Sequence, residues 1–201
     1  MSHEIVLYGS GTTRSSRCRW TLLELELPFE YVDNGKLIGT DQLRAMHPQA
    51  KLPALMIDGE PMFESAAICT HLCDLVPGQG MLGAPGTRER AAHMQWTSFC
   101  LTEMEAWLWS AAKHSAFYPE AERVADAVPS NYREFRRGAE VLNEALNGSD
   151  FLVGGRFSVT DIVVGWTVNW GRRAGQLEGL DHLHQYLGRL FDRPHCTFNP
   201  D

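Results

Sequence analysis

The stretch LPALMIDGEPMFESAAI, residues 52–68, contains in succession the signals for a strand, a tight turn, a second strand and the start of a helix. Pro53-Ala-Leu-Met-Ile57 is a short apolar run, Asp58-Gly59 is a hairpin-turn dipeptide, and Pro61-Met-Phe63 is a second short run. Ser65 then opens an apolar helical pattern. We therefore predict a β-hairpin that leads directly into a helix.

Two dipeptides in this stretch have the chemistry of a peptide-binding groove. Pro53 cannot donate to a sheet ladder, so at the first residue of a strand it leaves the backbone of Leu52 available to an extended ligand. Glu64 and Ser65 stand at a helix start, where unpaired amides favour a carboxylate. The Ser65 hydroxyl can donate to that carboxylate and Glu64 can accept from an ammonium.

Each dipeptide taken alone also has an ordinary structural explanation. X-Pro bonds are mostly trans, and a serine near a helix start is usually a cap. The first thirty residues favour the binding interpretation. They predict a strand over Ile5-Val-Leu-Tyr8, a tight loop, a helix from Ser15 to Glu26 and a strand over Phe29-Glu-Tyr-Val32. Followed by the hairpin and the closing helix, this order is that of a thioredoxin-like domain.

Over nearly its whole length the chain resembles the cytosolic glutathione S-transferases, in particular bacterial and theta-, zeta- or nu-like members with a hydroxyl in the first loop. The matching stretches are Leu7-Tyr8-Gly-Ser-Gly-Thr-Thr, Arg17-Cys-Arg-Trp20, Leu23-Glu-Leu-Glu-Leu-Pro-Phe-Glu30, His47-Pro48, Lys51-Leu-Pro-Ala-Leu55, Phe63-Glu-Ser-Ala-Ala-Ile68 and Ser158-Val-Thr-Asp161-Ile162. The resemblance implies an α/β thioredoxin-like N-terminal domain followed by an all-α helical bundle domain.

The resemblance also implies a function and a set of site residues. Glutathione is expected as co-substrate, held by Lys51, Leu52, Pro53, Glu64 and Ser65, with the bond before Pro53 in the cis form. The chain is then expected to be a transferase of the detoxification type, a homodimer in which each first domain packs on the partner's helical domain.

The catalytic position implied by the resemblance falls on Thr12, where relatives have Ser or Cys. A hydroxyl there would hold glutathione as a thiolate. Members with a shifted register would instead use Arg14 or Ser15, so Ser15 is the reserve candidate. The alternative for Thr12 is a loop hydroxyl that bonds its own backbone.

Composition and charge limit the partners. The 201 residues can bury a sizeable core, and a net charge of -7 argues against nucleic acid or an anionic membrane as the main partner. No segment approaches a membrane span, and the first residues lack a secretory pattern, so a cytoplasmic protein is expected. Arg14, Arg17 and Arg19 form a local basic cluster that either attracts an anionic tripeptide or is a solvated helix face paired with Glu24 or Glu26.

Cysteine and histidine usage favours reduced thiols and no metal. Five cysteines without a CxxC pattern fit free thiols, and Cys69 and Cys73, spaced i,i+4, are expected to be ordinary buried side chains. His182 and His184 are two apart, so on a helix they point away from each other and cannot readily chelate one ion. His47 is expected to be a loop contact rather than a base.

The remaining chain predicts a linker and a helical domain. The boundaries are residues 1–76 for the glutathione-binding domain, 77–86 for a Gly- and Pro-rich linker and 87–201 for the helices. Helices are expected over 87–113, 131–147 and 180–190. Ser158 and Asp161 form a capping box for a helix that runs to Trp170 and is apolar almost all round.

The sequence leaves the reaction open among three functions. The first is thiolate attack on a small hydrophobic electrophile, whose pocket would be lined by Trp107, Trp109, Phe117 and Tyr118, although each of these also fits plain packing. The second is a glutathione-dependent disulfide reductase, peroxidase or isomerase. The third is a non-enzymatic binding protein that keeps the fold.

Overall fold

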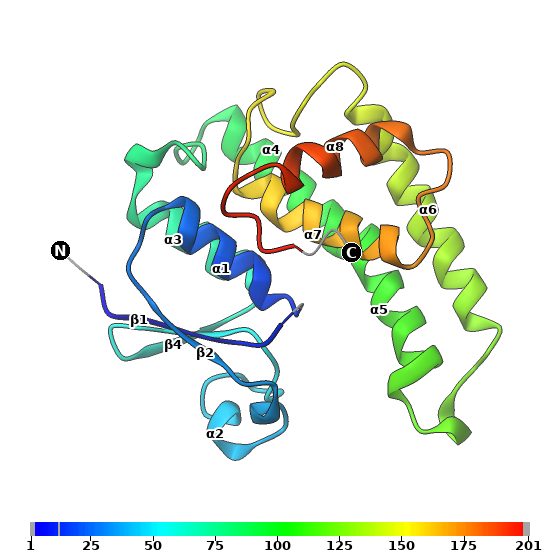
Figure 1. Ribbon diagram of the computed structural model, residues 1–201, viewed down its shortest axis with the longest axis horizontal. Coiled ribbons are helices and arrows are strands. Elements are labelled where there is room, and N and C mark those ends of the chain that lie inside the picture. The colour runs from blue at the N-terminus through cyan, green and yellow to red at the C-terminus, as the bar shows by residue number, and fades with distance from the viewer. Residues whose placement is uncertain (1–2, 12, 199–201) are drawn as a thin grey trace. The chain divides into compact units, whose positions relative to one another are not determined.

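The computed structural model describes residues 3–11 and 13–198, and the chain divides into two compact units (Figure 1). The first unit comprises the chain up to Ala84 together with the residues from Phe191 on, and the second comprises Pro85–Leu190. The last eleven residues thus group with the first unit, whereas the sequence analysis assigned everything after residue 86 to the helical domain.

The first unit is a thioredoxin-like domain, as expected. Its elements are β1 (Ile5–Gly9), α1 (Ser15–Glu24), β2 (Glu30–Asp33), η1 (Gly35–Leu37), α2 (Asp41–Arg44), β3 (Ala54–Ile57), β4 (Glu60–Phe63), α3 (Ser65–Leu75) and η2 (Pro77–Gln79). The short helices η1 and α2 were not predicted, because three- and four-residue helices are too short to show a helical period.

The sheet has the order β2-β1-β3-β4 within the described residues. β1 pairs parallel with β2 and antiparallel with β3, and β3 pairs antiparallel with β4. The predicted hairpin turn is confirmed: Asp58 and Gly59 both have positive φ, 50° and 85°, which a two-residue turn between twisted strands requires. In Figure 1, α1 and α3 lie on one face of this sheet and α2 lies on the other.

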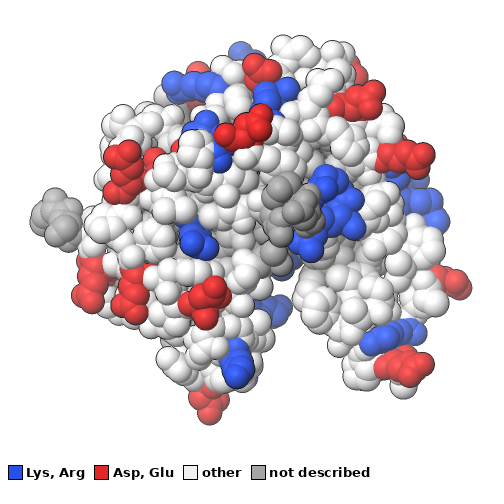
Figure 2. All heavy atoms as spheres, viewed as in Figure 1, with Lys and Arg blue, Asp and Glu red and all other residues white. Residues whose placement is uncertain are grey.

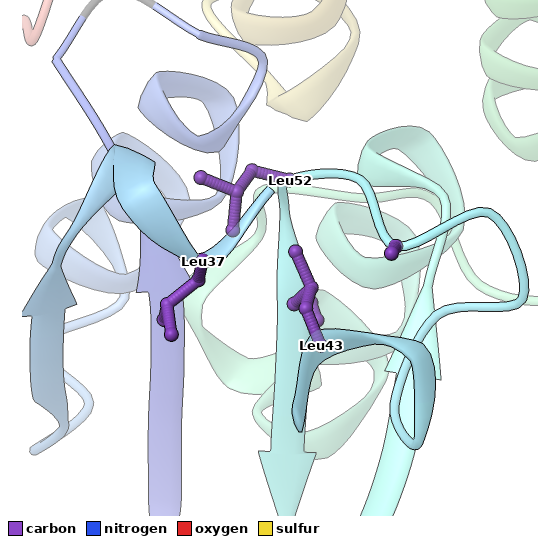
Figure 3. Close-up of a cluster of buried hydrophobic side chains, with 5 residues drawn as sticks. Leu37, Leu43 and Leu52 are labelled. Carbon is purple, nitrogen blue, oxygen red and sulfur yellow. The ribbon is translucent and has the colours of Figure 1, made fainter. Parts of the chain in front are cut away.

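A cluster of buried apolar side chains fixes the segment that leads into β3. Leu37 from η1, Leu43 from α2 and Leu52 gather around the start of that strand with Ala50 and Ala54 (Figure 3). Leu43 is fully buried and Leu52 is 8% exposed. Burial of a leucine side chain contributes about 1.5–3 kcal/mol. The packing therefore holds the Leu52 backbone in one place.

The second unit is all-helical, as expected. Its elements are α4 (Arg88–Phe99), the π-helical turn η3 (Cys100–Glu105), α5 (Ala106–Ala112), the π-helical turn η4 (Lys113–Phe117), η5 (Glu120–Glu122), α6 (Ala127–Ala145), α7 (Val159–Arg173) and α8 (Asp181–Phe191). The single helix expected over 87–113 is thus interrupted by wide turns, which hydrophobic spacing does not reveal. At Gly138 an added Cβ would lie 2.9 Å from the Glu103 carbonyl oxygen, so a glycine lets α6 approach η3.

The start of α7 carries the predicted capping box. Asp161 Oδ2 accepts from the Ser158 amide at 2.9 Å and from the Ser158 hydroxyl at 3.0 Å. Its Oδ1 accepts from the Leu152 amide and the Tyr186 hydroxyl, each at 3.1 Å. Asp161 is fully buried, and most of α7 is buried around its circumference, as its apolar sequence predicts.

The surface carries charges of both signs. Acidic and basic side chains of the described residues are both scattered over the face shown in Figure 2. Among the residues that the structure describes, no helix combines the length and the apolar character that a membrane crossing requires.

Candidate functional site

The segment before β3 presents its backbone at the edge of the strand pairing. The Leu52–Pro53 peptide bond is cis, as the resemblance implied. Strand pairing begins one residue later, where Ala54 faces Tyr8 and Phe63. The Leu52 peptide therefore lies outside the ladder while its side chain is anchored in the core, which leaves its backbone without a strand partner.

Lys51 precedes this segment and is exposed. Its Nζ donates to Gln49 Oε1 at 2.6 Å. His47 is 7% exposed, its Nδ1 accepts from the Gln49 amide at 3.1 Å, and its ring lies 5.0 Å from the Phe63 ring. Burial lowers the pKa of His47, so the ring is neutral at pH 7. These contacts agree with the predicted loop role of His47.

Glu64 has a strained backbone between β4 and α3. Its φ is 70° and its ψ is 106°, a conformation that a residue with a side chain rarely adopts. Such strain costs on the order of 1–3 kcal/mol and persists where the surrounding structure enforces it. The Glu64 side chain is exposed, so its carboxylate is open to solvent at the start of α3.

Ser65 is the first residue of α3, and its hydroxyl accepts a hydrogen bond from a buried side chain. Arg17 Nη1 donates to Ser65 Oγ at 3.1 Å, and both side chains are buried. A guanidinium cannot accept a hydrogen bond, so this contact uses an acceptor lone pair of Ser65 and not its proton. The hydroxyl is thereby fixed with its proton directed to another acceptor.

Helix α3 begins without a side-chain cap from Glu64. The first amides of any helix have no partner within it and lie at the positive end of the helix dipole. These amides and the Ser65 hydroxyl are donors of the kind that suits a carboxylate, and the exposed Glu64 beside them is a group that suits an ammonium. A ligand with an α-amino acid end matches this pair.

The first loop bears the two catalytic candidates. Thr12 lies outside the described residues. Ser15 is fully buried, and its Oγ accepts from the Ser10 amide at 3.2 Å and contacts Thr13 Oγ1 at 2.7 Å. A Cβ on Gly9 would come within 2.6 Å of this hydroxyl. In this structure the buried Ser15 hydroxyl therefore stabilises the first loop through its contacts with Ser10 and Thr13.

The arginines of the basic cluster near the first helix lie in different environments. Arg17 is fully buried, so the alternative of a solvated face is wrong for this residue. Arg19 is exposed and stacks over the Tyr31 ring, 4.9 Å from its centroid. Glu24, which was one expected partner of these arginines, is bonded by Arg193 Nη2 at 2.7 Å instead.

In the second unit, the aromatic candidates form two separate groups. Trp109 lies 5.2 Å from Phe117 and 6.5 Å from Trp170, which in turn lies 5.4 Å from Trp166. Phe117 is 67% exposed.

The second group surrounds Tyr118, whose ring lies 5.1 Å from the His114 ring and beneath Lys113 Nζ. Trp107 is half-buried, and because it is two residues from Trp109 it points to another side of the helix.

The cysteine side chains are free thiols, as expected. All five cysteines are free, and Cys69 and Cys73 are buried. No group of three or more His, Cys, Asp or Glu side chains suited to a metal ion occurs within 3–11 and 13–198.

Sequence reasoning missed that the Arg17 side chain is buried and bonds Ser65, and that Trp166 and Trp170 belong to the same aromatic group as Trp109. One signal for Arg17 was present: Arg17 and Thr21 are spaced i,i+4 next to the apolar face of Cys18 and Leu22. That spacing places a charged and a polar side chain at the margin of the buried stripe. The tryptophans gave no such signal, since the same positions read equally as core.

Comparisons with known proteins connect this geometry to a family. The family model described as glutathione S-transferase, N-terminal domain, matches residues 7–80, and that described as glutathione S-transferase, C-terminal domain, matches residues 122–189. Glutathione S-transferase GstA of Escherichia coli O157:H7 is 26% identical over 187 residues, covering 91% of this chain and 86% of that protein.

Two further similarities cover nearly the whole chain. Disulfide-bond oxidoreductase YfcG of Escherichia coli K12 is 29% identical over 202 residues, covering 94% of this chain and 91% of that protein. The solved structure of a sphingomonad glutathione S-transferase complexed with glutathione has a TM-score of 0.83 at 25% identity, covering 95% of this chain and 94% of that one.

Proposed function

The chain belongs to the cytosolic glutathione S-transferase family, and we propose that it binds glutathione in its first unit and promotes attack of the thiolate on a small hydrophobic electrophile. The observation that carries this proposal is the start of α3. There an uncapped helix end, a Ser65 hydroxyl oriented by Arg17 and an exposed Glu64 in a strained conformation stand together.

The proposed pose matches each charged group of glutathione to a described residue. The γ-glutamyl carboxylate is bound by the Ser65 hydroxyl and the α3 amides, and its ammonium is bound by Glu64. The peptide backbone pairs with the Leu52 backbone beside Pro53, as a strand added to a sheet edge would. The exposed Lys51 ammonium supplies positive charge for the glycyl carboxylate.

The thiol would be ionised by a hydroxyl of the first loop, for which Thr12 is our candidate. Lowering a thiol pKa from about 8.5 to about 6.5 needs roughly 2.7 kcal/mol. A hydrogen bond to a charged group supplies about 1.5–3 kcal/mol, and a helix N-terminus about 0.3–2 kcal/mol. One hydroxyl and one helix N-terminus together are therefore sufficient. The buried position of Ser15 supports Thr12 over the reserve candidate.

The electrophile would contact the aromatic side chains of the second unit. Trp109 and the largely exposed Phe117 offer ring surface of the kind that binds planar apolar groups. Tyr118 and Trp107 remain candidates of the same proposal, with the Tyr118 hydroxyl available to a leaving group.

Two measurements test this function. Calorimetry should show saturable binding of glutathione to the wild-type protein. Absorbance titration of the bound thiol should give a pKa well below that of free glutathione, and Thr12→Ala should return it toward the free value. Ser10→Ala, in the same loop, is the matched control. Equal thiol pKa values in wild type and Thr12→Ala would remove Thr12 from the mechanism.

A second candidate function is glutathione-dependent disulfide reduction on the same site. The similarity to disulfide-bond oxidoreductase YfcG over 94% of this chain favours it. Assays with an aryl halide, a small disulfide, a peroxide and an epoxide separate the two functions. Turnover of the disulfide with none of the halide would replace transfer by reduction, and glutathione binding without any turnover would indicate a binding protein.

We also propose that the protein acts as a homodimer in the cytoplasm. Free cysteines throughout the chain support a reducing compartment. Sedimentation of the intact protein tests the dimer, because a monomer mass at micromolar concentration would exclude it.

A further inference from the structure

Helix α1 packs against α3 within the first unit, and two consecutive residues of α1 contact Ser65. Arg17 Nη1 donates to the Ser65 hydroxyl oxygen at 3.1 Å. The Cys18 thiol, a weaker donor, lies with its Sγ 3.8 Å from the Ser65 carbonyl oxygen. Arg17 and Cys18 are fully buried, and Ser65 is 5% exposed. Both oxygen atoms of the first residue of α3 are therefore contacted by α1 side chains in the interior.

Arg17 places a permanent positive charge beside the Ser65 hydroxyl. A guanidinium stays protonated in proteins, and arginine is seldom fully buried because removing its charge from water is costly. The burial of Arg17 means that salt screens its charge less than the charge of a surface arginine. The Ser65 hydroxyl therefore lies next to a positive charge that solvent weakens little.

The charge balance at the start of α3 also depends on Glu64, whose side chain is exposed and negative. Without a positive group nearby, this carboxylate would repel an anionic group of a ligand bound beside it. The Arg17 guanidinium supplies that positive charge on the interior side of Ser65. An α-amino acid end, which carries a carboxylate and an ammonium, then meets a group of opposite charge for each.

The Ser65 hydroxyl is the group through which Arg17 can act on a ligand. A hydroxyl that accepts a hydrogen bond from a cation becomes a better donor, because successive hydrogen bonds polarise one another. An anionic acceptor gains most from this, since hydrogen bonds to a carboxylate are shorter and stronger than those between neutral groups. The contact with Arg17 thus favours a carboxylate over a neutral group as the acceptor of the Ser65 proton.

We propose that Arg17 is a positioning residue that determines specificity: through the Ser65 hydroxyl it makes the start of α3 selective for the α-carboxylate of the γ-glutamyl end of glutathione. The inference rests on the proposed binding of glutathione and deepens it. Arg17 acts through Ser65 and does not touch the ligand in the proposed pose. The inference does not involve the first loop, so it holds whichever hydroxyl ionises the thiol.

The test compares two ligands by calorimetry. The second ligand is γ-aminobutyryl-cysteinyl-glycine, which lacks the α-carboxylate of glutathione and keeps its ammonium, its thiol and its glycyl carboxylate. The readout is the ratio of the two Kd values. The wild-type protein should prefer glutathione roughly 10- to 100-fold, as expected for a hydrogen bond to a charged group.

Two substitutions of Arg17 should lower this preference. Arg17→Met removes the charge and the donor at similar length, and should lower the preference about tenfold. Arg17→Lys keeps the charge on a shorter side chain, and should lower it about threefold. Where Arg17→Met does not fold, Arg17→Lys decides the question with the same pair of ligands.

Two control variants separate specificity from stability and from net charge. Leu22→Ala removes a fully buried side chain of α1, so it should lower the melting temperature and leave the ratio of Kd values at the wild-type value. Arg44→Met removes an exposed arginine of the same unit, whose Nε lies 3.8 Å from Asp41 Oδ1, and should also leave the ratio unchanged. Each variant is measured below its own melting temperature.

The outcomes distinguish this inference from the proposed function. A wild-type protein that prefers glutathione, together with the same preference in a folded Arg17 variant, overturns the inference alone. An equal loss of preference in Leu22→Ala gives Arg17 a purely structural role and also overturns it. Equal binding of both ligands to the wild-type protein overturns the inference while glutathione binding stands. A wild-type protein that does not bind glutathione overturns the proposed function and this inference with it.

Discussion

Helices α3 and α7 both have a serine at their start, Ser65 as the first residue of α3 and Ser158 as the N-cap of α7, yet the two starts differ in their side-chain hydrogen bonds. At α7, Ser158 and Asp161 bond one another and the helix end inside a buried capping box. At α3, no side-chain cap is formed, Glu64 is strained and exposed, and the Ser65 hydroxyl is bonded from behind by Arg17. The start of α7 is satisfied within the fold, whereas the start of α3 lacks a side-chain cap and is where we propose that glutathione binds.

The largest effect should come from breaking the capping box at the start of α7. Asp161→Ala leaves four donors around a buried position without their acceptor, namely the amides of Leu152 and Ser158 and the hydroxyls of Ser158 and Tyr186. We expect a loss of about 4 kcal/mol in unfolding free energy. Calorimetry should show a melting temperature lower by roughly 10 °C. The exposed Asp126, which starts α6 without a side-chain hydrogen bond, provides the control Asp126→Ala, which should change little.

The same carboxyl should also make stability depend on pH. Burial raises the pKa of Asp161 from 3.8 to about 6 in the folded protein, against hydrogen bonds from Leu152 and Ser158 that lower it. Between these values the folded state binds more protons than the unfolded state, so this contribution to stability is present below pH 3.8 and lost as the pH rises through 6. It amounts to about 3 kcal/mol.

Asp161→Asn cannot titrate, so comparing it with wild type isolates this contribution. The difference in unfolding free energy between the two proteins, measured by denaturant titration from pH 4 to pH 7, should shift by this amount. A constant difference over that range would contradict the raised pKa.

At the start of α3, Ser65→Ala should affect glutathione binding more than folding. Removing a hydroxyl that donates to a carboxylate costs about 1.5–3 kcal/mol, so the Kd for glutathione should rise roughly 10- to 100-fold in calorimetry. Thr70→Ala, in the same helix but bonded to the Ala66 carbonyl, is the control and should bind normally. Equal affinity in both variants would mean that α3 does not hold the ligand.

The smallest effect, and the sharpest test of the comparison, is a gain in stability at Glu64. Glycine tolerates a φ of 70° without strain, so Glu64→Gly should raise the unfolding free energy by about 1 kcal/mol while weakening glutathione binding. Glu64→Gln keeps the strain and removes only the charge. It should weaken binding without the gain, and a gain in both variants would show that charge rather than backbone strain destabilises the site.

Local sequence patterns predicted the structural features that depend on contacts between neighbours in sequence. The hairpin through Asp58-Gly59, the start of α3 at Ser65 and the capping box of α7 all rest on contacts within a few residues, and the structure confirms them. The short helices η1 and α2, the π-helical turns around α5 and the buried role of Ser15 were missed, because spacing in the sequence does not report what packs above or below a loop.

The sequence by itself determined the thioredoxin-like order of elements, the helical second unit and the start of α3 at Ser65, since hydrophobic period, turn residues and helix caps are short-range properties. Only the tertiary structure decided which distant residues contact one another. Arg17 reaches Ser65 across 48 residues, and Thr197 reaches Ser16 across 181. Such contacts are set by the packing of distant segments against one another, which no local sequence pattern predicts.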